Sequence, residues 1–493
     1  GFNWSTSTGS NSGGSSSTNA LTPSVEGAEL MVGDLMDDIT FQYNASAASG
    51  SGSGSSSSSS FAYANNKLSA GYQSTCAILD NGDLKCWGSD SYGQLGDGGG
   101  SMETNAPSST AIDLGSGRTA VAVSAGEQHT CAILDNGELK CWGRDSEGQL
   151  GDGGSNMNTQ APPYSWAIDL GSGRTAVAVS AGSTHTCAIL DNGDMKCWGW
   201  DSYGMLGDGG SNDATTEPSS TAIDLGSGRT AVAVAVGLQH TCAILDNGDL
   251  KCWGDDSNGQ LGDGGSNADI NAPSSTAIDL GTGRTAVAVA VGLKFTCAIL
   301  DNGDLKCWGQ DSQGQLGDGG PAWSSSNPTD TNAPSSTAID LGSGRTAVAV
   351  SAGYHHTCVI LDNGEAKCWG ANYYGELGDG TNTNTNAPSS TAINLGTGRT
   401  AVAMTAGYYH TCAILDNGEA KCWGYDGFGQ LGDGGSNTDQ ASPVAVSGSN
   451  TWDSSTVLSS GSSGGSSSVS SGGSSSSSSF AYANNKLAAG FHT

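Results

Sequence analysis

Short apolar runs recur along most of this chain, and each is bounded by glycine, asparagine, aspartate or serine. In one stretch, the runs Thr130–Leu134 and Leu139–Trp142 are separated by Asp-Asn-Gly. Two β-forming runs joined by such a turn predict a β-hairpin. The stretch occurs seven times at intervals of 54 to 61 residues, and a period of this length is typical of propellers and solenoids.

The turn also predicts how the two strands of the hairpin pair. A three-residue loop with Gly137 in the left-handed region places Leu134 opposite Glu138, and Cys131 then lies opposite Cys141. Directly opposed Cβ atoms are about 4.5–5.5 Å apart, close to the roughly 3.5–4.5 Å of a disulfide. A two-residue turn would instead put the sulfurs on opposite faces. Pairing and loop type therefore depend on each other.

All fourteen cysteines belong to seven such pairs, which predicts seven disulfides and an oxidising compartment, extracellular or at the cell surface. Zinc is the alternative, but nine residues between two cysteines without a further ligand suit it poorly. The predicted pairs are Cys76 with Cys86, Cys131 with Cys141, Cys187 with Cys197, Cys242 with Cys252, Cys297 with Cys307, Cys358 with Cys368, and Cys412 with Cys422.

Each repeat contains four candidate strands. In the second repeat they are Ala120–Ser124, Thr130–Leu134, Leu139–Trp142 and Ala167–Leu170. The last type, Ala-Ile-Asp-Leu or Ala-Ile-Asn-Leu, occurs six times, and Val444–Val446 provides a seventh. One four-stranded sheet cannot bury both faces, whereas seven sheets packed radially can. The prediction is an all-β, seven-bladed β-propeller over residues 61–446, with four strands and one disulfide in each blade.

The repeat carries a resemblance to a known family. His-Thr-Cys-Ala-Ile-Leu-Asp-Asn-Gly-Glu-Leu-Lys-Cys-Trp-Gly, followed by Gly-Gln-Leu-Gly-Asp-Gly, resembles the regulator of chromosome condensation repeat. The resemblance covers about residues 65–446 and implies a seven-bladed propeller, most similar to secreted prokaryotic members. In the namesake, nucleotide exchange depends on an inserted wedge and chromatin binding on a basic tail. The only sizeable insertion here is Pro321–Thr331, so neither function is expected.

Charge narrows the classes of partner. The net charge is −31 and only 17 residues are Lys or Arg, so the chain has no basic surface to replace the counterions of a nucleic acid. No apolar run of 18 residues occurs, so we expect no membrane insertion. Residues 1–60 form a Ser/Gly-rich segment in which 1–20 and 45–60 are predicted to be linkers, and 447–479 is a further Ser/Gly-rich linker. Leu21–Tyr43 differs by its apolar content and includes a possible strand at 39–43. Asn3 and Asn44 lie in glycosylation sequons.

One strand type occurs an eighth time. Lys67–Gly71 precedes the first hairpin, and Lys486–Gly490 repeats it within a longer duplication in which residues 480–493 match 61–74. The chain therefore ends at the threshold of another propeller. The copy begins a further propeller in series, is donated to a neighbouring chain, or closes its own ring. Its apolar side chains, predicted to form an assembly strand, are Phe480, Tyr482, Leu487 and Phe491.

Variation between repeats is concentrated at one rim of the predicted ring. The hairpin pairing places Gln128 opposite Arg144 and Tyr409 opposite Tyr425. An aromatic and acidic rim on a rigid scaffold suits recognition of a protein or a glycan; alternatively, these side chains only cover the blade edges. The predicted binding rim comprises Tyr72, Tyr92, Trp200, Tyr203, Tyr354, Tyr373, Tyr374, Tyr408, Tyr409, Tyr425 and Phe428.

Metal and catalytic sites find less support. Five histidines share one repeat position that holds Phe295 and Ser74 in the other two repeats, which favours packing and hydrogen bonding over metal binding. The Asp residues of the Gly-Asp-Gly segments leave calcium as an alternative, although Asp is common in turns. No catalytic constellation or phosphate loop stands apart from the repeat, so we expect neither an enzyme nor a cofactor. The histidines are His129, His185, His240, His356 and His410, and the aspartates are Asp97, Asp152, Asp208, Asp263, Asp318, Asp379 and Asp433.

Two functional hypotheses follow from these patterns. The first is an extracellular structural or adhesive propeller in a serial array or filament, in which neighbouring copies of the chain are the partners and strand donation is one way to join them. The second is a secreted binding module that recognises a surface protein or glycan through the aromatic rim.

Overall fold

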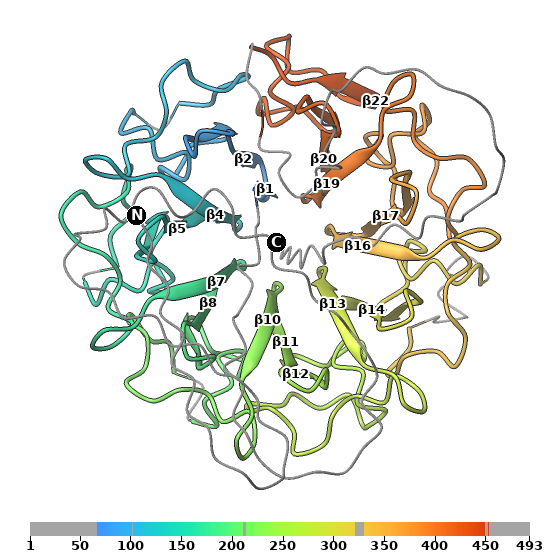
Figure 1. Ribbon diagram of the computed structural model, residues 1–493, viewed down its shortest axis with the longest axis horizontal. Coiled ribbons are helices and arrows are strands. Elements are labelled where there is room, and N and C mark those ends of the chain that lie inside the picture. The colour runs from blue at the N-terminus through green and yellow to red at the C-terminus, as the bar shows by residue number, and fades with distance from the viewer. Residues whose placement is uncertain are drawn as a thin grey trace, which may run out of the picture. The chain divides into compact units, whose positions relative to one another are not determined.

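The computed structural model describes residues 67–100, 102–154, 156–210, 213–320, 330–448 and 452. Within them, seven antiparallel sheets are arranged as the blades of a closed ring, with the first strand of each sheet nearest the axis (Figure 1). The predicted all-β, seven-bladed propeller is confirmed. This part of the chain consists of strands and turns, and it includes no helix that could cross a membrane.

Three strands recur in every blade, in the order first strand, hairpin strand, hairpin strand. Blades one to three are β1 (Leu68–Ala70), β2 (Ser74–Ile78) and β3 (Leu84–Gly88); β4 (Ala120–Ala125), β5 (His129–Leu134) and β6 (Leu139–Gly143); and β7 (Ala176–Ala181), β8 (His185–Leu190) and β9 (Met195–Gly199). Blades four and five are β10 (Ala231–Val236), β11 (His240–Leu245) and β12 (Leu250–Gly254), and β13 (Ala286–Val291), β14 (Phe295–Leu300) and β15 (Leu305–Gly309). Blades six and seven are β16 (Ala347–Ala352), β17 (His356–Leu361) and β18 (Ala366–Gly370), and β19 (Ala401–Ala406), β20 (His410–Leu415), β21 (Ala420–Gly424) and β22 (Gln440–Ala445).

The hairpin has the predicted pairing and turn. Cys131 of β5 lies opposite Cys141 of β6, and the amide of Leu134 donates to the carbonyl of Glu138 at 2.9 Å. Gly137 has φ 79°, a conformation that glycine adopts without the steric cost of a Cβ. The same pairing recurs in every blade, and all seven predicted disulfides are formed with Cα–Cα distances of 4.1 Å.

The predicted fourth strand is wrong for six of the seven blades. In the second blade, the third strand pairs outward only at an isolated bridge between Gly143 and Thr159 and through the amide of Ile168, which donates to Leu139. Seven or eight residues lie between these two contacts in blades one to six, so the excess loops away from the sheet. Only five residues lie between Gln440 and Val446 in blade seven, and the shorter segment lies along β21 as β22. This strand begins earlier than the predicted Val444–Val446.

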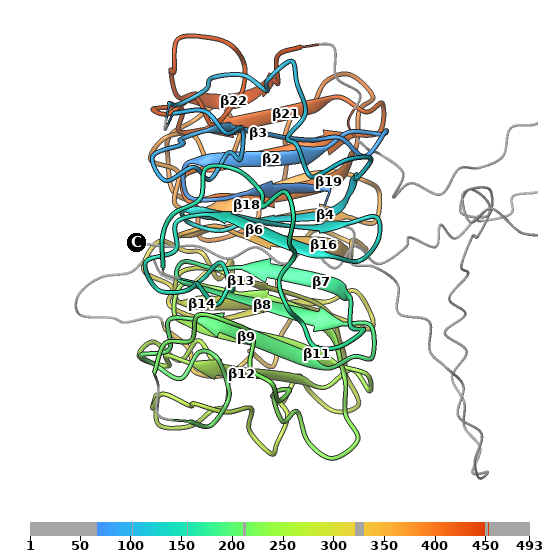
Figure 2. The same ribbon diagram turned by 90° about the vertical axis from the view of Figure 1, so that its left-hand side faces the viewer.

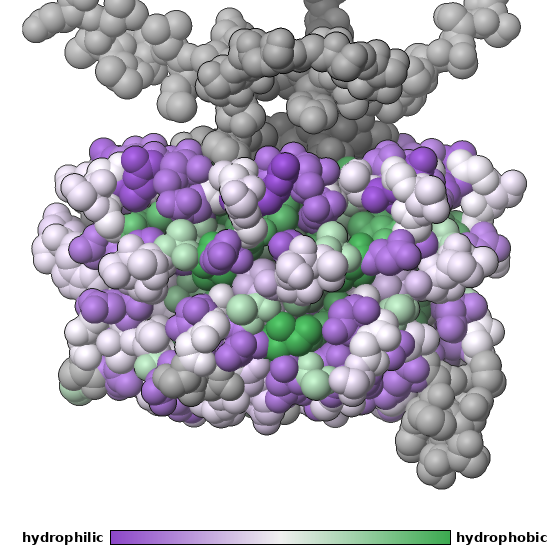
Figure 3. Space-filling model, turned by 90° about the horizontal axis from the view of Figure 1, so that it is seen from below, coloured by the Kyte–Doolittle hydropathy of each residue, from purple (hydrophilic) through white to green (hydrophobic). Residues whose placement is uncertain are grey.

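The apolar side chains form cores between neighbouring blades rather than one central core. Leu250 of β12 and Trp308 of β15, for example, are fully buried in one cluster that blades four and five share. The side view in Figure 2 shows the sheets lying next to one another around the ring. In Figure 3 the edge of the ring is mostly hydrophilic, and hydrophobic residues lie recessed among the hydrophilic ones. Each blade therefore depends on its neighbours to bury its two faces.

The ring closes where the two ends of the repeated region meet. β1 has three residues, whereas the first strand of every other blade has six. Trp452 supplies the missing start of this strand: it bridges to Leu79, and its amide donates to Gly418 of blade seven at 3.0 Å. In the third blade, Ala176 makes the equivalent contacts with Leu190 and Gly137. The innermost strand of blade one thus combines two distant parts of the chain.

Trp452 lies in the segment predicted to be a linker, and its role in the ring was not predicted. Its indole is 2% exposed and packs on Trp87, with ring centroids 5.5 Å apart. Several other predictions fall outside the described residues, so the structure does not bear on them. They are the possible strand at 39–43, the sequons at Asn3 and Asn44, and the assembly-strand residues Phe480, Tyr482, Leu487 and Phe491.

We predict that Trp452→Ala destabilises the ring more than any exposed tryptophan substitution. It removes a buried indole at the closing junction, which typically costs about 3–5 kcal/mol. Urea unfolding under non-reducing conditions measures the change. Trp166→Ala is the matched control because Trp166 is 41% exposed, and its expected cost is below about 0.5 kcal/mol. Equal losses in the two variants would show that Trp452 does not close the ring.

Candidate functional site

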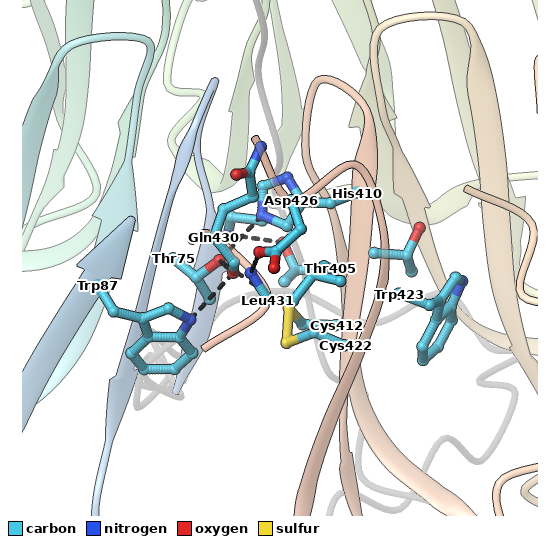
Figure 4. Close-up of a disulfide and its surroundings, with 12 residues drawn as sticks. Thr75, Trp87, Thr405, His410, Cys412, Cys422, Trp423, Asp426, Gln430 and Leu431 are labelled. Carbon is cyan, nitrogen blue, oxygen red and sulfur yellow. Dashed lines mark hydrogen bonds between the residues drawn. A yellow bond between two sulfur atoms is a disulfide. The ribbon is translucent and has the colours of Figure 1, made fainter. Parts of the chain in front are cut away.

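Every pair of neighbouring blades is joined by one backbone carbonyl that accepts two hydrogen bonds. At the closing junction, the carbonyl of Gln430 accepts from the hydroxyl of Thr75 at 2.9 Å and from the indole of Trp87 at 3.0 Å (Figure 4). The contributing carbonyls belong to Gln94, Gln149, Met205, Gln260, Gln315, Glu376 and Gln430. This arrangement explains why Thr and Trp recur in all seven repeats.

The repeated histidines extend this contact between blades. His410 Nε2 lies 2.9 Å from Thr75 Oγ1 of the next blade, and the other four histidines make the same contact. All five histidines are buried. Burial lowers the pKa of His410 to about 3, so its imidazole stays neutral. The histidines therefore hydrogen-bond and pack between blades, as expected. The described part of the chain contains no group of three His, Cys, Asp or Glu side chains arranged to hold a metal ion.

The aspartates of the Gly-Asp-Gly segments support their own turns. Asp152 Oδ1 accepts from the amide of Gly154 at 2.7 Å, and the six equivalent aspartates accept in the same way. Each of these carboxylates is thus engaged locally, as is usual for aspartate in turns.

Residues from two sets of loops share one face of the ring. The amide of Tyr425 donates to the carbonyl of Tyr409 at 2.8 Å, and Arg144 donates to Gln128 in the same manner. The loops between the first two strands therefore lie beside the segments that follow the third strands. The residue pairs predicted for the rim do face each other.

Seven of the eleven predicted rim residues form one continuous group across blades six, seven and one, which we call the aromatic sector. The Tyr354 and Tyr408 rings stack with centroids 3.7 Å apart, and Tyr72 meets Tyr408 edge-on at 4.4 Å. Tyr374 lies 5.1 Å from Tyr409 and 4.9 Å from Tyr425. The sector consists of Tyr72, Tyr354, Tyr374, Tyr408, Tyr409, Tyr425 and Phe428.

The other four predicted residues are placed differently. Trp200 and Tyr203 pair with each other in blade three. Tyr92 lies under the Arg144 guanidinium, 5.6 Å from its ring centroid to Cζ. Tyr373 is 49% exposed and donates its hydroxyl to Gln313. The rim is therefore aromatic mainly in one sector and not around its whole circumference.

Burial affects the ionisation of three phenols in the sector. It is the main cause that raises the pKa of Tyr408, Tyr409 and Tyr425 above the ordinary value of 10.0. Phenols are uncharged at physiological pH, and the faces of their rings carry partial negative charge.

Sequence reasoning missed one carboxylate in this region. Glu376 occupies the repeat position that holds Gln94, Gln149, Gln260, Gln315 and Gln430 elsewhere. Its Oε2 accepts from the amide of Tyr374 at 2.8 Å, while Oε1 is buried and has no hydrogen-bond partner. Burial is the main cause that raises the pKa of Glu376, to about 7, while backbone hydrogen bonds from its own amide, Tyr374 and Gly375 act in the opposite direction. The exchange of Gln for Glu in one repeat was the signal by which it could have been found.

Comparison with known proteins agrees with this geometry. Two models described as the regulator of chromosome condensation (RCC1) repeat match the chain. One matches residues 66–94, 120–149, 176–204, 231–260, 286–315, 347–376 and 401–430. The other matches residues 81–133, 136–189, 302–360 and 363–414. The ultraviolet-B receptor UVR8 of Arabidopsis thaliana is 32% identical over 331 residues, covering 67% of this chain and 70% of the receptor.

The chain belongs to the RCC1 repeat family. It is also 28% identical over 325 residues to the human E3 ubiquitin-protein ligase HERC2, but it spans only 6% of that protein's length. The crystal structure of Prp20p from Saccharomyces cerevisiae superposes with a TM-score of 0.63 at 21% identity, covering 78% of this chain and 89% of Prp20p. At that identity the likeness concerns the fold alone. As an RCC1 repeat protein, the chain combines the shared propeller with a disulfide in each hairpin, which indicates an oxidising compartment.

The buried histidines generate a prediction about stability and pH. Burial, with a smaller contribution from Arg144, lowers the pKa of His129 to about 3 from its ordinary value of 6.5. Between these values the unfolded chain binds a proton that the folded chain does not, so folding becomes less stable as the pH falls. We expect the free energy of unfolding of His129→Phe to decline less steeply with falling pH, by roughly 1.4 kcal/mol per pH unit. Urea unfolding at pH 6, 5 and 4 measures the slope.

The chain offers the reverse substitution as a control for this prediction. Phe295 occupies the histidine position in blade five and is fully buried, so Phe295→His should steepen the same decline. Unchanged slopes in both variants would mean that these positions do not control acid stability.

Proposed function

We propose that the protein is an extracellular structural component whose propellers are joined in series through the innermost strand of the first blade. The observation that carries the proposal is the composite strand at the closing junction, read together with the second copy of its sequence. β1 pairs with β2 across the short loop of residues 71–73, and we propose that the second copy of its sequence takes the same place in a neighbouring propeller by β-strand donation. Seven disulfides and a net charge of −31 suit an extracellular location.

The contacts of β1 define what an exchanged strand must provide. Leu68 is buried in the core that blades seven and one share. Ser69 Oγ accepts from the amide of Ala125 at 2.9 Å, and the amide of Ala70 donates to Thr405 Oγ1 at 3.1 Å. An exchanged strand therefore needs an apolar side chain at its first position and small residues at the next two in order to fit between the neighbouring strands.

The second copy meets these requirements in its sequence. Residues 480–490 repeat 61–71 with one change, Ala488 in place of Ser69. Ala235 and Ala290 occupy the corresponding position of the first strands in blades four and five, so the propeller already accepts alanine there. The repeated strand has the side chains to form the innermost strand of blade one in a neighbouring propeller.

We predict that Leu487→Asp prevents association of the full chain. The substitution would place a carboxylate in an apolar site, where a buried charge without a partner is strongly unfavourable. Negative-stain electron microscopy and light scattering of unreduced protein should show rows of propellers for the unsubstituted chain and single propellers for the variant.

Two further variants sharpen this test. Leu458→Asp makes the same chemical change outside the duplicated segment and should leave association intact. Leu68→Asp damages the chain's own strand but leaves the donated copy, so it should still associate. Single propellers of the unsubstituted chain at every concentration, or assembly by the Leu487 variant, would refute the proposal.

A binding propeller is the second candidate function, and the aromatic sector favours it. Six tyrosines and one phenylalanine gather on one face of three adjacent blades, while the scaffold beneath repeats almost unchanged. Clustered aromatic side chains on rigid supports are typical of recognition surfaces. A surface protein and a glycan are the two ligand classes expected from the sequence.

A further inference from the structure

Because the blades repeat, equivalent side chains lie at each junction between blades on the face of the ring that carries the aromatic sector. The junctions can therefore be compared with one another. At blades four and five, Gln260 Nε2 donates to Asp255 Oδ2 at 2.9 Å. Lys294 of the next blade lies 3.5 Å from the same carboxylate oxygen. This junction therefore holds a carboxylate together with the ammonium group that balances it.

The junction between blades six and seven has the carboxylate but not the cation. Glu376 replaces the amide of Gln260, while Ala371 and Tyr409 stand at the positions of Asp255 and Lys294. Glu376 Oε1 is buried without a partner. The Nε2 atoms of Gln149 and Gln430 at the same repeat position are also buried without a partner, so an unpartnered atom is shared by several junctions. Only Glu376 brings a group that can carry charge to this buried position, and burying a charge is costly.

The surroundings of Glu376 suit a positively charged group. Its neighbour Tyr374 belongs to the aromatic sector, together with Tyr409 and Tyr425. The loops of this sector, residues 71–73, 89–94, 353–355, 371–376, 407–409 and 425–430, contain no Lys or Arg. Tyrosine rings attract ammonium and guanidinium groups, and the net charge of −31 favours encounter with a basic partner.

The chain itself shows that tyrosines of this face accept a cation. Arg144 of blade two lies over the Tyr92 ring of blade one, with Cζ 5.6 Å from the centroid. Its Nη1 also donates to Gln128 Oε1 at 2.7 Å. An aromatic face and an acceptor oxygen thus hold one guanidinium between two blades, and Glu376 with the tyrosines around it offers the same two elements between blades six and seven.

We propose that the aromatic sector and Glu376 form a binding site for a lysine or arginine side chain presented by a basic segment of a partner protein. The carboxylate pairs with the cationic group while the tyrosine faces contact its stem and charge. Because Glu376 Oε1 is buried, binding requires the loop tyrosines to turn aside and admit the incoming side chain. This inference develops the second candidate function and does not depend on strand exchange.

The test uses the full chain and a fluorescein-labelled peptide of alternating lysine and glycine, followed by fluorescence anisotropy at pH 8 in 0.15 M salt. Glu376→Gln restores the residue found at this position in five other blades, so the variant should fold. We expect it to weaken peptide binding by about 30-fold or more, the usual effect of removing one partner of a buried charge pair. Tyr409→Ala should also weaken binding, through the lost ring contact.

A matched control separates a specific site from general acidity. Glu419→Gln removes the same charge from an exposed position in the hairpin turn of blade seven, on the opposite face, and should leave affinity unchanged. Equal weakening by the two variants, or no binding of the lysine peptide, would overturn the proposal. Binding of a neutral oligosaccharide that Tyr409→Ala abolishes and Glu376→Gln leaves intact would assign the sector to a glycan instead. If the variants lose peptide binding but still assemble, the proposed serial array is unaffected by the result.

Discussion

The propeller depends on one backbone carbonyl in each blade that accepts both an indole and a hydroxyl hydrogen from the next blade. The carbonyls of Gln149 and Gln430 each do so at their junctions. Because the acceptor is a main-chain atom, its own side chain is free to vary, and Met205 and Glu376 also serve. The donors cannot vary in this way, which explains why Thr and Trp are invariant among the seven copies while the residues of the rim differ.

In a closed ring of such repeats, the first and last blades are not consecutive in the sequence, so their junction differs from the others. Here the chain enters at β1 and returns with Trp452, and the two ends together make one innermost strand. Because the chain is not continuous at this junction, a large apolar contact holds the two parts together. Trp452 packs on Trp87, whereas the position equivalent to Trp452 is alanine in the other blades, for example Ala176 in blade three. This division also brings Tyr72 of blade one beside Tyr408 of blade seven, so closure of the ring is what completes the aromatic sector.

Local sequence was sufficient for the hairpins and insufficient for contacts that depend on closure. Asp-Asn-Gly determined the turn, and the turn determined that Cys131 faces Cys141. The prediction of an outer strand was wrong because strand-like composition at Ala167–Leu170 does not reveal the seven or eight residues that must fit alongside a short partner strand. Trp452 lies among serines and glycines, and only the vacant start of β1 gives it a role. The rim was predicted as a circle, whereas ring distances show one sector.

Glu376 differs from the rest of the rim in a way that the scaffold does not explain. A glutamine there would accept the same amide hydrogen with its oxygen, as Gln315 does from Gln313, and would retain the carbonyl contact to the next blade. The acid adds nothing to these interactions. Its Oε1 is buried without a partner, as are the Nε2 atoms of Gln149 and Gln430 at the same repeat position, so what sets Glu376 apart is its capacity to carry charge. Where six other repeats keep an uncharged side chain, a destabilising carboxylate beneath tyrosines indicates a requirement outside the fold, and a cationic group from a partner is the chemistry that satisfies it.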